Sequence, residues 1–132
     1  MRVYLCRHAH ARSGSPDAER ALSPAGEEQA RALAARLAAA EPRPTVVLSS
    51  PLKRACQTAQ AIAEALGVDA QVESRLAPGA TAAALLAVVR ESGAAAVVTV
   101  GHQPDCSDIV QAVTGSDPGF PTAGMAVIDL DG

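Results

Sequence analysis

The stretch Ala96-Val97-Val98-Thr99-Val100-Gly101-His102-Gln103-Pro104 decides the fold of this chain. Its first five residues form a continuous run that is almost wholly apolar, which is typical of a parallel strand buried on both faces. Gly101 ends that run, and Pro104 opens a segment with helical spacing that continues to Val113 and stops at Gly115. A buried strand that leads directly into a helix predicts an alternating α/β fold.

The same alternation extends along the rest of the chain. Apolar runs predict four further strands, at residues 3–6, 45–48, 70–72 and 126–130. Apolar residues at helical spacing predict three more helices, which follow Ser23, Pro51 and Thr81. We therefore expect a three-layer α/β/α fold with a mainly parallel central sheet of about five strands, formed by a single domain over residues 1–132.

Composition restricts the classes of function. Eleven Lys and Arg residues against 14 Asp and Glu residues give a formal net charge of -3, which argues against a general nucleic-acid or membrane partner. No apolar run is long enough to span a bilayer, and the N-terminus lacks the basic-then-apolar order of a signal peptide, so we expect a cytoplasmic protein. Three cysteines without a CxxC pair indicate neither a disulfide framework nor a structural zinc site.

Three of the predicted strands end in loops with charged and polar side chains. Arg7-His8-Ala9-His10 follows the first strand, residues 49–54 follow the second, and residues 101–104 follow the fourth. Because the carboxyl ends of parallel strands lie at one edge of a sheet, we expect these loops to meet there. Arginine side chains and helix N-termini favour an anion. The sequence therefore predicts a phosphate site at this edge.

The order of these segments and their residue types match a known set of motifs. Arg7-His8-Ala9, then Ser50-Pro51-Leu52-Lys53-Arg54-Ala55-Cys56-Gln57-Thr58-Ala59, then Gly101-His102-Gln103-Pro104 resemble the three motifs of the histidine phosphatase (phosphoglycerate mutase-like) superfamily. The segment Leu22-Ser23-Pro24-Ala25-Gly26 and the short span are similar to the small bacterial SixA-type branch. The resemblance implies a phosphoglycerate mutase-like fold and links the chain to dephosphorylation of phosphohistidine in proteins.

The same resemblance implies roles for four residues. His8 would be the nucleophile that takes the phosphoryl group, His102 a second catalytic residue, and Arg7, Arg54 and His102 the holders of the phosphate oxygens. A neutral imidazole can attack phosphorus, and fixed cationic donors stabilise the charge of the transition state. Nothing in this route requires a metal or another cofactor, so none is expected. The resulting expectation is a metal-independent phosphatase acting on a phosphorylated protein; the oligomeric state stays unknown.

Two departures from the family pattern affect these expectations. Ala9 replaces the usual glycine, which is tolerable only at a negative φ. Larger members place a glutamate general acid after the third strand, where this chain offers only Glu73, with Asp105 as a second candidate. A phosphohistidine needs less help from an acid than a sugar phosphate, because imidazole is a better leaving group than an alkoxide. The short span between Leu66 and Ala94 leaves no room for a long cap, so we expect an open site.

Two alternative functions fit the same motifs. One is a module that binds phosphate or a phosphoprotein without turnover. The other is a broad phosphomonoesterase whose partner is a small phosphate ester, which an open site would admit. A phosphoglycerate-type mutase is disfavoured because both the acid and the cap are missing.

Two other kinds of chemistry use residues near the first motif. Cys6 and Arg12 have the Cys-x5-Arg spacing of cysteine-dependent phosphatases, but no glycine lies between them to let the loop wrap an anion. Cys6, His8 and His10 alternate as soft metal ligands could, although the nearby arginines oppose a cation. We expect His10 at the pocket rim without a catalytic role, and Arg12 and Lys53 as rim charges.

Overall fold

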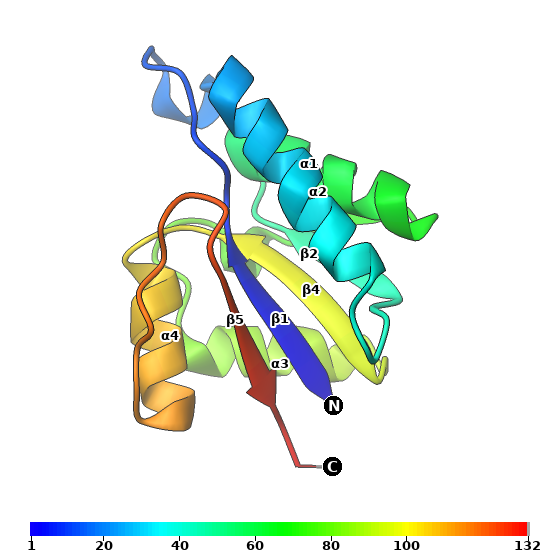
Figure 1. The fold of residues 1–132 in the computed structure, drawn as a ribbon. Helices are drawn as coiled ribbons and strands as arrows, with labels where there is room; N and C mark the ends of the chain where they lie inside the picture. Colours follow the sequence, from blue (N-terminus) through cyan, green and yellow to red (C-terminus); the bar gives the residue numbers. More distant parts are fainter. Residues whose placement is uncertain (132) are drawn as a thin grey trace.

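The computed structural model describes residues 1–131 and contains one five-stranded sheet, in the order β3-β2-β4-β1-β5 (Figure 1). The strands are β1 (Arg2–Arg7), β2 (Val46–Ser49), β3 (Ala70–Val72), β4 (Ala96–Gly101) and β5 (Met125–Asp129). The first four run parallel to one another, and β5 runs antiparallel to β1. The expected mainly parallel sheet of five strands is confirmed, with boundaries that differ from the predicted ones by a residue or two.

Helices cover both faces of this sheet. They are α1 (Pro24–Ala38), α2 (Lys53–Leu66), α3 (Ala82–Glu91) and α4 (Asp105–Thr114), with short 3-10 helices η1 (Asp17–Glu19) and η2 (Ser74–Leu76) between them. α1 packs beside α2 on one face, and α3 beside α4 on the other (Figure 1). The three-layer α/β/α prediction is therefore confirmed. Within residues 1–131, no helix is long and apolar enough to cross a membrane.

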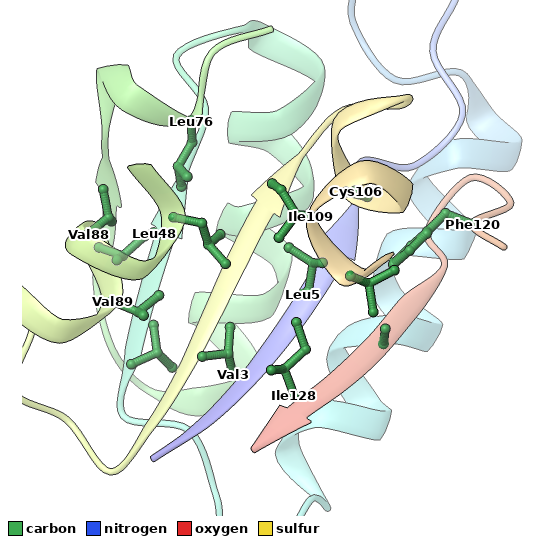
Figure 2. Close-up of a cluster of buried hydrophobic side chains, with 14 residues drawn as sticks. Val3, Leu5, Leu48, Leu76, Val88, Val89, Cys106, Ile109, Phe120 and Ile128 are labelled. Atoms are coloured by element: carbon green, nitrogen blue, oxygen red, sulfur yellow. The ribbon is translucent and has the colours of Figure 1, made fainter. Parts of the chain in front are cut away.

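Alternation along the central strands divides the core between the two faces. Val3 and Leu5 point toward α3 and α4, where they pack with Val89 and Ile109 (Figure 2). Tyr4 and Cys6 belong to the cluster beneath α1 and α2. Successive side chains of a strand point to opposite faces, so a strand covered on both sides must be apolar throughout. This explains why β1 and β4 read as continuous apolar runs.

The helix ends follow the capping signals in the sequence. The Ser23 hydroxyl accepts a hydrogen bond from the Gly26 amide at 3.0 Å, with Pro24 at the first helical position. Gly67 and Gly115 end α2 and α4 in the left-handed conformation. The two 3-10 helices were not predicted, because three residues are too few to show a period.

Strand register places the three polar loops at one edge. Arg7 of β1 pairs with Gly101 of β4, and Ser49 of β2 pairs with Val100 of β4. The His8 amide continues the ladder by donating to the Gly101 carbonyl at 3.0 Å. The carboxyl ends of β1, β4 and β2 are therefore level, and the predicted meeting of the three loops is confirmed.

Candidate active site

A cavity of about 380 Å³ lies at this edge of the sheet. All four residues predicted for the site line it. The complete lining is Arg7, His8, His10, Ala11, Asp17, Arg20, Arg54, Pro78, His102, Gln103 and Thr122. His8, Arg54 and His102 are buried, with 8%, 6% and 3% of their surface exposed. The structure thus brings together side chains from three separate strand ends.

The His8 ring is held in one tautomer. Its Nδ1 lies 2.7 Å from the carbonyl oxygen of Ala9. A carbonyl only accepts, so Nδ1 carries the proton and Nε2 carries the lone pair. Burial lowers the pKa of His8 below its ordinary value; the hydrogen bond to the Ala9 carbonyl opposes this shift in part, and the charges of Arg54 and Arg7 add to it. A neutral ring with a free Nε2 is the form that can attack phosphorus.

The two arginines are anchored through their terminal nitrogens. Arg54 donates from Nη1 to the Asp17 carbonyl at 2.9 Å and from Nη2 to the Asp17 carboxylate at 3.2 Å. Arg7 donates from Nη1 to the Phe120 carbonyl at 2.9 Å. In both side chains Nε is buried and has no hydrogen-bond partner. Each guanidinium is therefore anchored, while its Nε has no hydrogen-bond partner within the protein.

His102 lies beside His8 on the neighbouring strand end. The two ring centroids are 5.2 Å apart, with the rings inclined at 53°. The Nε2 atom of His102 is 2.7 Å from the Ser50 hydroxyl, and its Nδ1 is buried without a partner. Burial, followed by the effects of His8 and Arg54, lowers the pKa of His102 to about 4. His102 is therefore neutral at physiological pH.

Unpartnered buried atoms concentrate around the cavity. Among residues 1–131, four buried side-chain nitrogen or oxygen atoms have no partner, namely Arg7 Nε, Arg54 Nε, His102 Nδ1 and Thr99 Oγ1. The first three belong to residues that line the cavity. Buried polar groups are nearly always hydrogen-bonded, so a cluster of exceptions indicates a ligand site. Two guanidinium donors and an imidazole suit an oxyanion such as phosphate.

Neither predicted general acid lies in the cavity. Glu73 forms an ion pair with Arg75 at 2.8 Å and lines a different hollow. Asp105 accepts a hydrogen bond from the Gly79 amide at 2.9 Å and is absent from the lining around His8. The glutamate position of the larger relatives is therefore not matched by either residue.

The carboxylate that does line the cavity is Asp17, which was not among the predicted site residues. It pairs with Arg54 at 3.2 Å and with Arg20 at 2.9 Å. Desolvation tends to raise the pKa of Asp17, but hydrogen bonds and charge from Arg54 and Arg20 outweigh it and hold the pKa below its usual value. Asp17 is thus ionised and has no proton to donate to a leaving group.

Ala9 fits its place without strain. It is completely buried, and it is not among the residues with a positive φ. Its amide donates to the Thr58 hydroxyl at 3.0 Å, and that hydroxyl donates to the Arg54 carbonyl at 2.8 Å. The alanine therefore satisfies the condition on φ and joins the His8 loop to the start of α2.

The rim differs in part from the prediction. His10 lines the cavity as expected, with Nδ1 at 2.7 Å from the Ser23 hydroxyl. Arg12 and Lys53 are not part of the lining, so their prediction as rim charges is not supported. Arg20 takes that position instead, because it directly follows η1, whose Asp17 is bonded to Arg54 at the start of α2.

The two alternative chemistries find little support in this geometry. Cys6 is fully buried in β1, and desolvation raises the pKa of its thiol well above the ordinary range, which disfavours a reactive thiolate. Within the described part of the chain, no group of three or more His, Cys, Asp or Glu side chains is arranged to hold a metal ion.

The fold and the cavity together define an α/β protein with an anion site built around a histidine at the end of its first strand. A sequence profile of the histidine phosphatase superfamily (branch 1) matches residues 3–78. A curated protein of Picosynechococcus sp., itself uncharacterised, is 37% identical over 120 residues, covering 86% of this chain and 73% of that protein. The chain therefore belongs to the histidine phosphatase superfamily, branch 1, and is a phosphatase of that class.

Solved structures agree with this assignment. The putative phosphohistidine phosphatase SixA from Agrobacterium tumefaciens is 35% identical, with a TM-score of 0.84 over 98% of this chain and 91% of that one. The protein histidine phosphatase SixA complexed with tungstate is 29% identical, with a TM-score of 0.87 over 99% and 89%. A mycobacterial glucosyl-3-phosphoglycerate phosphatase, at 22% identity and a TM-score of 0.77, shares the fold. These matches support the SixA-type branch and confirm the phosphoglycerate mutase-like fold.

Proposed function

We propose that the chain is a metal-independent phosphatase that hydrolyses phosphohistidine in a protein through a phosphorylated His8. The observation that carries this proposal is the set of three unpartnered buried nitrogens, Arg7 Nε, Arg54 Nε and His102 Nδ1, around one cavity. They can donate to three oxygens of one phosphoryl group. The relative complexed with tungstate, a tetrahedral oxyanion, supports the same kind of ligand here.

In the first step, the Nε2 lone pair of His8 attacks phosphorus. A bond forms between Nε2 and phosphorus as the bond from phosphorus to the substrate nitrogen breaks, and the substrate ring, protonated from solvent on its other nitrogen, leaves as neutral imidazole. Charge on the equatorial oxygens is stabilised by Arg7 and Arg54, whose guanidiniums need no rearrangement because their terminal nitrogens are already anchored. The Ala9 carbonyl holds the Nδ1 proton and stabilises the positive charge that the His8 ring acquires.

In the second step, water attacks the phosphorylated His8. A bond from phosphorus to oxygen forms, the bond to Nε2 breaks, and inorganic phosphate leaves with the proton balance completed by solvent. The ionised Asp17 carboxylate lines the same cavity and is available to accept a proton from that water. The neutral His8 is then restored in its original tautomer.

The choice of phosphohistidine as substrate rests on what the cavity offers to a leaving group. Glu73 and Asp105 lie outside it, and Asp17 is ionised. An alkoxide leaves readily only when an acid protonates it, whereas the imidazole of a phosphohistidine depends less on one. The similarity to SixA, a protein histidine phosphatase, supports the same class of substrate.

The experiment that tests this proposal compares phosphate release from a phosphohistidine protein and from an aryl phosphate. Wild type, His8→Ala and Cys6→Ser are assayed with and without a chelator. We expect activity that resists the chelator, is lost with His8→Ala, persists with Cys6→Ser, and is higher on the phosphohistidine protein.

Each other outcome favours a different function. Higher activity on the aryl phosphate would favour a broad phosphomonoesterase. Vanadate binding without turnover of either substrate would favour a binding module. Loss of activity with the chelator would contradict the metal-independent mechanism.

A further inference from the structure

We infer that Ser50 is a positioning residue that fixes His102 in the tautomer whose Nδ1–H faces the phosphoryl oxygens. The inference rests on the proposed function for its catalytic consequence, while the tautomer itself is a property of the unliganded protein. Ser50 and His102 are both buried, with 0% and 3% of their surface exposed. Bulk water therefore does not compete for their hydrogen bonds.

The groups in contact with the Ser50 hydroxyl determine the direction of its hydrogen bond to His102. The Ser50 oxygen accepts from the Leu52 amide at 3.2 Å and lies 2.7 Å from His102 Nε2. A hydroxyl has one proton to donate. Among residues 1–131, the only acceptor in hydrogen-bond contact with that proton is Nε2 of His102. The Ser50 hydroxyl therefore donates, and Nε2 of His102 accepts.

A neutral imidazole that accepts at Nε2 carries its proton on Nδ1. That atom is the buried His102 nitrogen without a partner. The reverse tautomer would leave the Ser50 proton unpaired and would turn a lone pair toward the anion site. Both consequences are unfavourable for buried groups, so His102 carries its proton on Nδ1.

The arrangement provides a neutral hydrogen-bond donor beside a neutral nucleophile. A positively charged His102 would repel the positive charge that develops on the His8 ring, 5.2 Å away. The pKa of about 4 keeps His102 uncharged, and Ser50 keeps the proton on the nitrogen that faces the ligand. Arg7 and Arg54 then supply the fixed positive charge.

Imidazole nitrogen NMR tests the tautomer directly. Long-range ¹H–¹⁵N spectra of the ¹⁵N-labelled wild type are recorded at neutral pH without phosphate, and His102 is assigned by the peaks that disappear in His102→Gln. We expect Nδ1 of His102 to show the shift of a protonated nitrogen and Nε2 that of an unprotonated one. The reverse pattern, or averaged shifts, would overturn the inference.

Ser50→Ala and the matched variant Ser49→Ala test the cause. The Ser49 hydroxyl is equally buried and donates to the Ser50 carbonyl at 2.8 Å without contacting His102. We expect averaged His102 shifts and about a tenfold lower kcat/KM in Ser50→Ala, and wild-type values in Ser49→Ala. Equal effects of both variants, with an unchanged His102 spectrum in Ser50→Ala, would show that Ser50 has only a structural role.

Failure of the proposed function would be distinguishable from failure of the role inferred for Ser50. If wild type binds phosphate without turnover, the spectra alone still test the tautomer of His102 and its loss in Ser50→Ala. If turnover is present but the pattern is reversed, the function stands and the role of Ser50 is wrong.

Discussion

His8 and His102 occupy corresponding positions at the ends of adjacent parallel strands. The register of β1 and β4 pairs Arg7 with Gly101, and the next residue on each strand is a histidine whose ring lies 5.2 Å from the other. Two imidazoles in one buried site, beside two guanidiniums, are both driven to the neutral form. The relative positions of the nucleophile His8 and the neighbouring donor His102 are thus determined by strand register.

Burial of neutral His102 predicts a dependence of stability on pH. The folded pKa of His102 is about 4, against 6.5 for an ordinary histidine. As pH falls below 6.5 the unfolded chain binds more protons than the folded one, so the free energy of unfolding should decrease until pH reaches about 4. Urea unfolding of wild type and His102→Gln across this range measures the difference. The slope should be smaller in the variant, and equal slopes would contradict the assignment.

Arg54 and Lys53 form a matched pair of adjacent cations. Arg54 is buried in the cavity wall, and Lys53 is outside it. Replacing Arg54 with Ala should lower kcat/KM by about 100-fold or more and weaken phosphate binding, because one fixed donor and its charge are lost. Lys53→Ala should remain close to wild type in steady-state kinetics. Equal losses in the two variants would mean that only general electrostatic attraction is involved.

The Asp17 carboxylate places a negative charge beside the anion site. It contacts Arg54 and Arg20, both of which line the cavity. Asp17→Asn keeps an oxygen for these hydrogen bonds and removes the charge, so inorganic phosphate should bind about threefold to tenfold more tightly. Calorimetric titration with phosphate gives the affinity. Asp129→Asn, in the exposed pair with Arg2, is the control, and weaker binding in Asp17→Asn would show that its charge mainly positions the arginines.

Gly26 is required by a close approach between α1 and the loop after β1. A side-chain carbon added at Gly26 would overlap the main-chain carbonyl of His10. Gly26→Ala should therefore destabilise the fold by about 2 kcal/mol. Thermal unfolding of this variant and of Glu27→Ala, its exposed neighbour, measures the effect. Similar melting temperatures for Gly26→Ala and wild type would contradict the packing.

The parts of the structure that follow from periodicity and strand order could be predicted from the sequence. The continuous run in β4 and the three polar segments after β1, β2 and β4 were enough to predict the sheet and the meeting of Arg7, His8, Arg54 and His102. Parallel strands with level carboxyl ends bring such segments together whatever their separation along the chain.

Features that leave no periodic pattern in the sequence could not be predicted. Asp17 reaches Arg54 across 37 residues from a polar loop, and no spacing rule connects the two. The antiparallel direction of β5 depends on how the irregular segment after α4 returns to the edge of β1. The bond between Ser50 and His102 joins residues 52 positions apart and forms only when β2 and β4 are aligned.

The most direct test of the central claim is to trap the phosphorylated enzyme. Wild type is mixed with a phosphohistidine protein, quenched within one turnover under alkaline conditions, and the phosphorylated residue and nitrogen are identified by tandem mass spectrometry and ³¹P NMR. Because Nδ1 of His8 donates to the Ala9 carbonyl, the phosphoryl group should be on Nε2 of His8 and absent from His8→Ala. A phosphoryl group on another residue such as Cys6, or on Nδ1 of His8, would contradict the mechanism, as would turnover retained by His8→Ala.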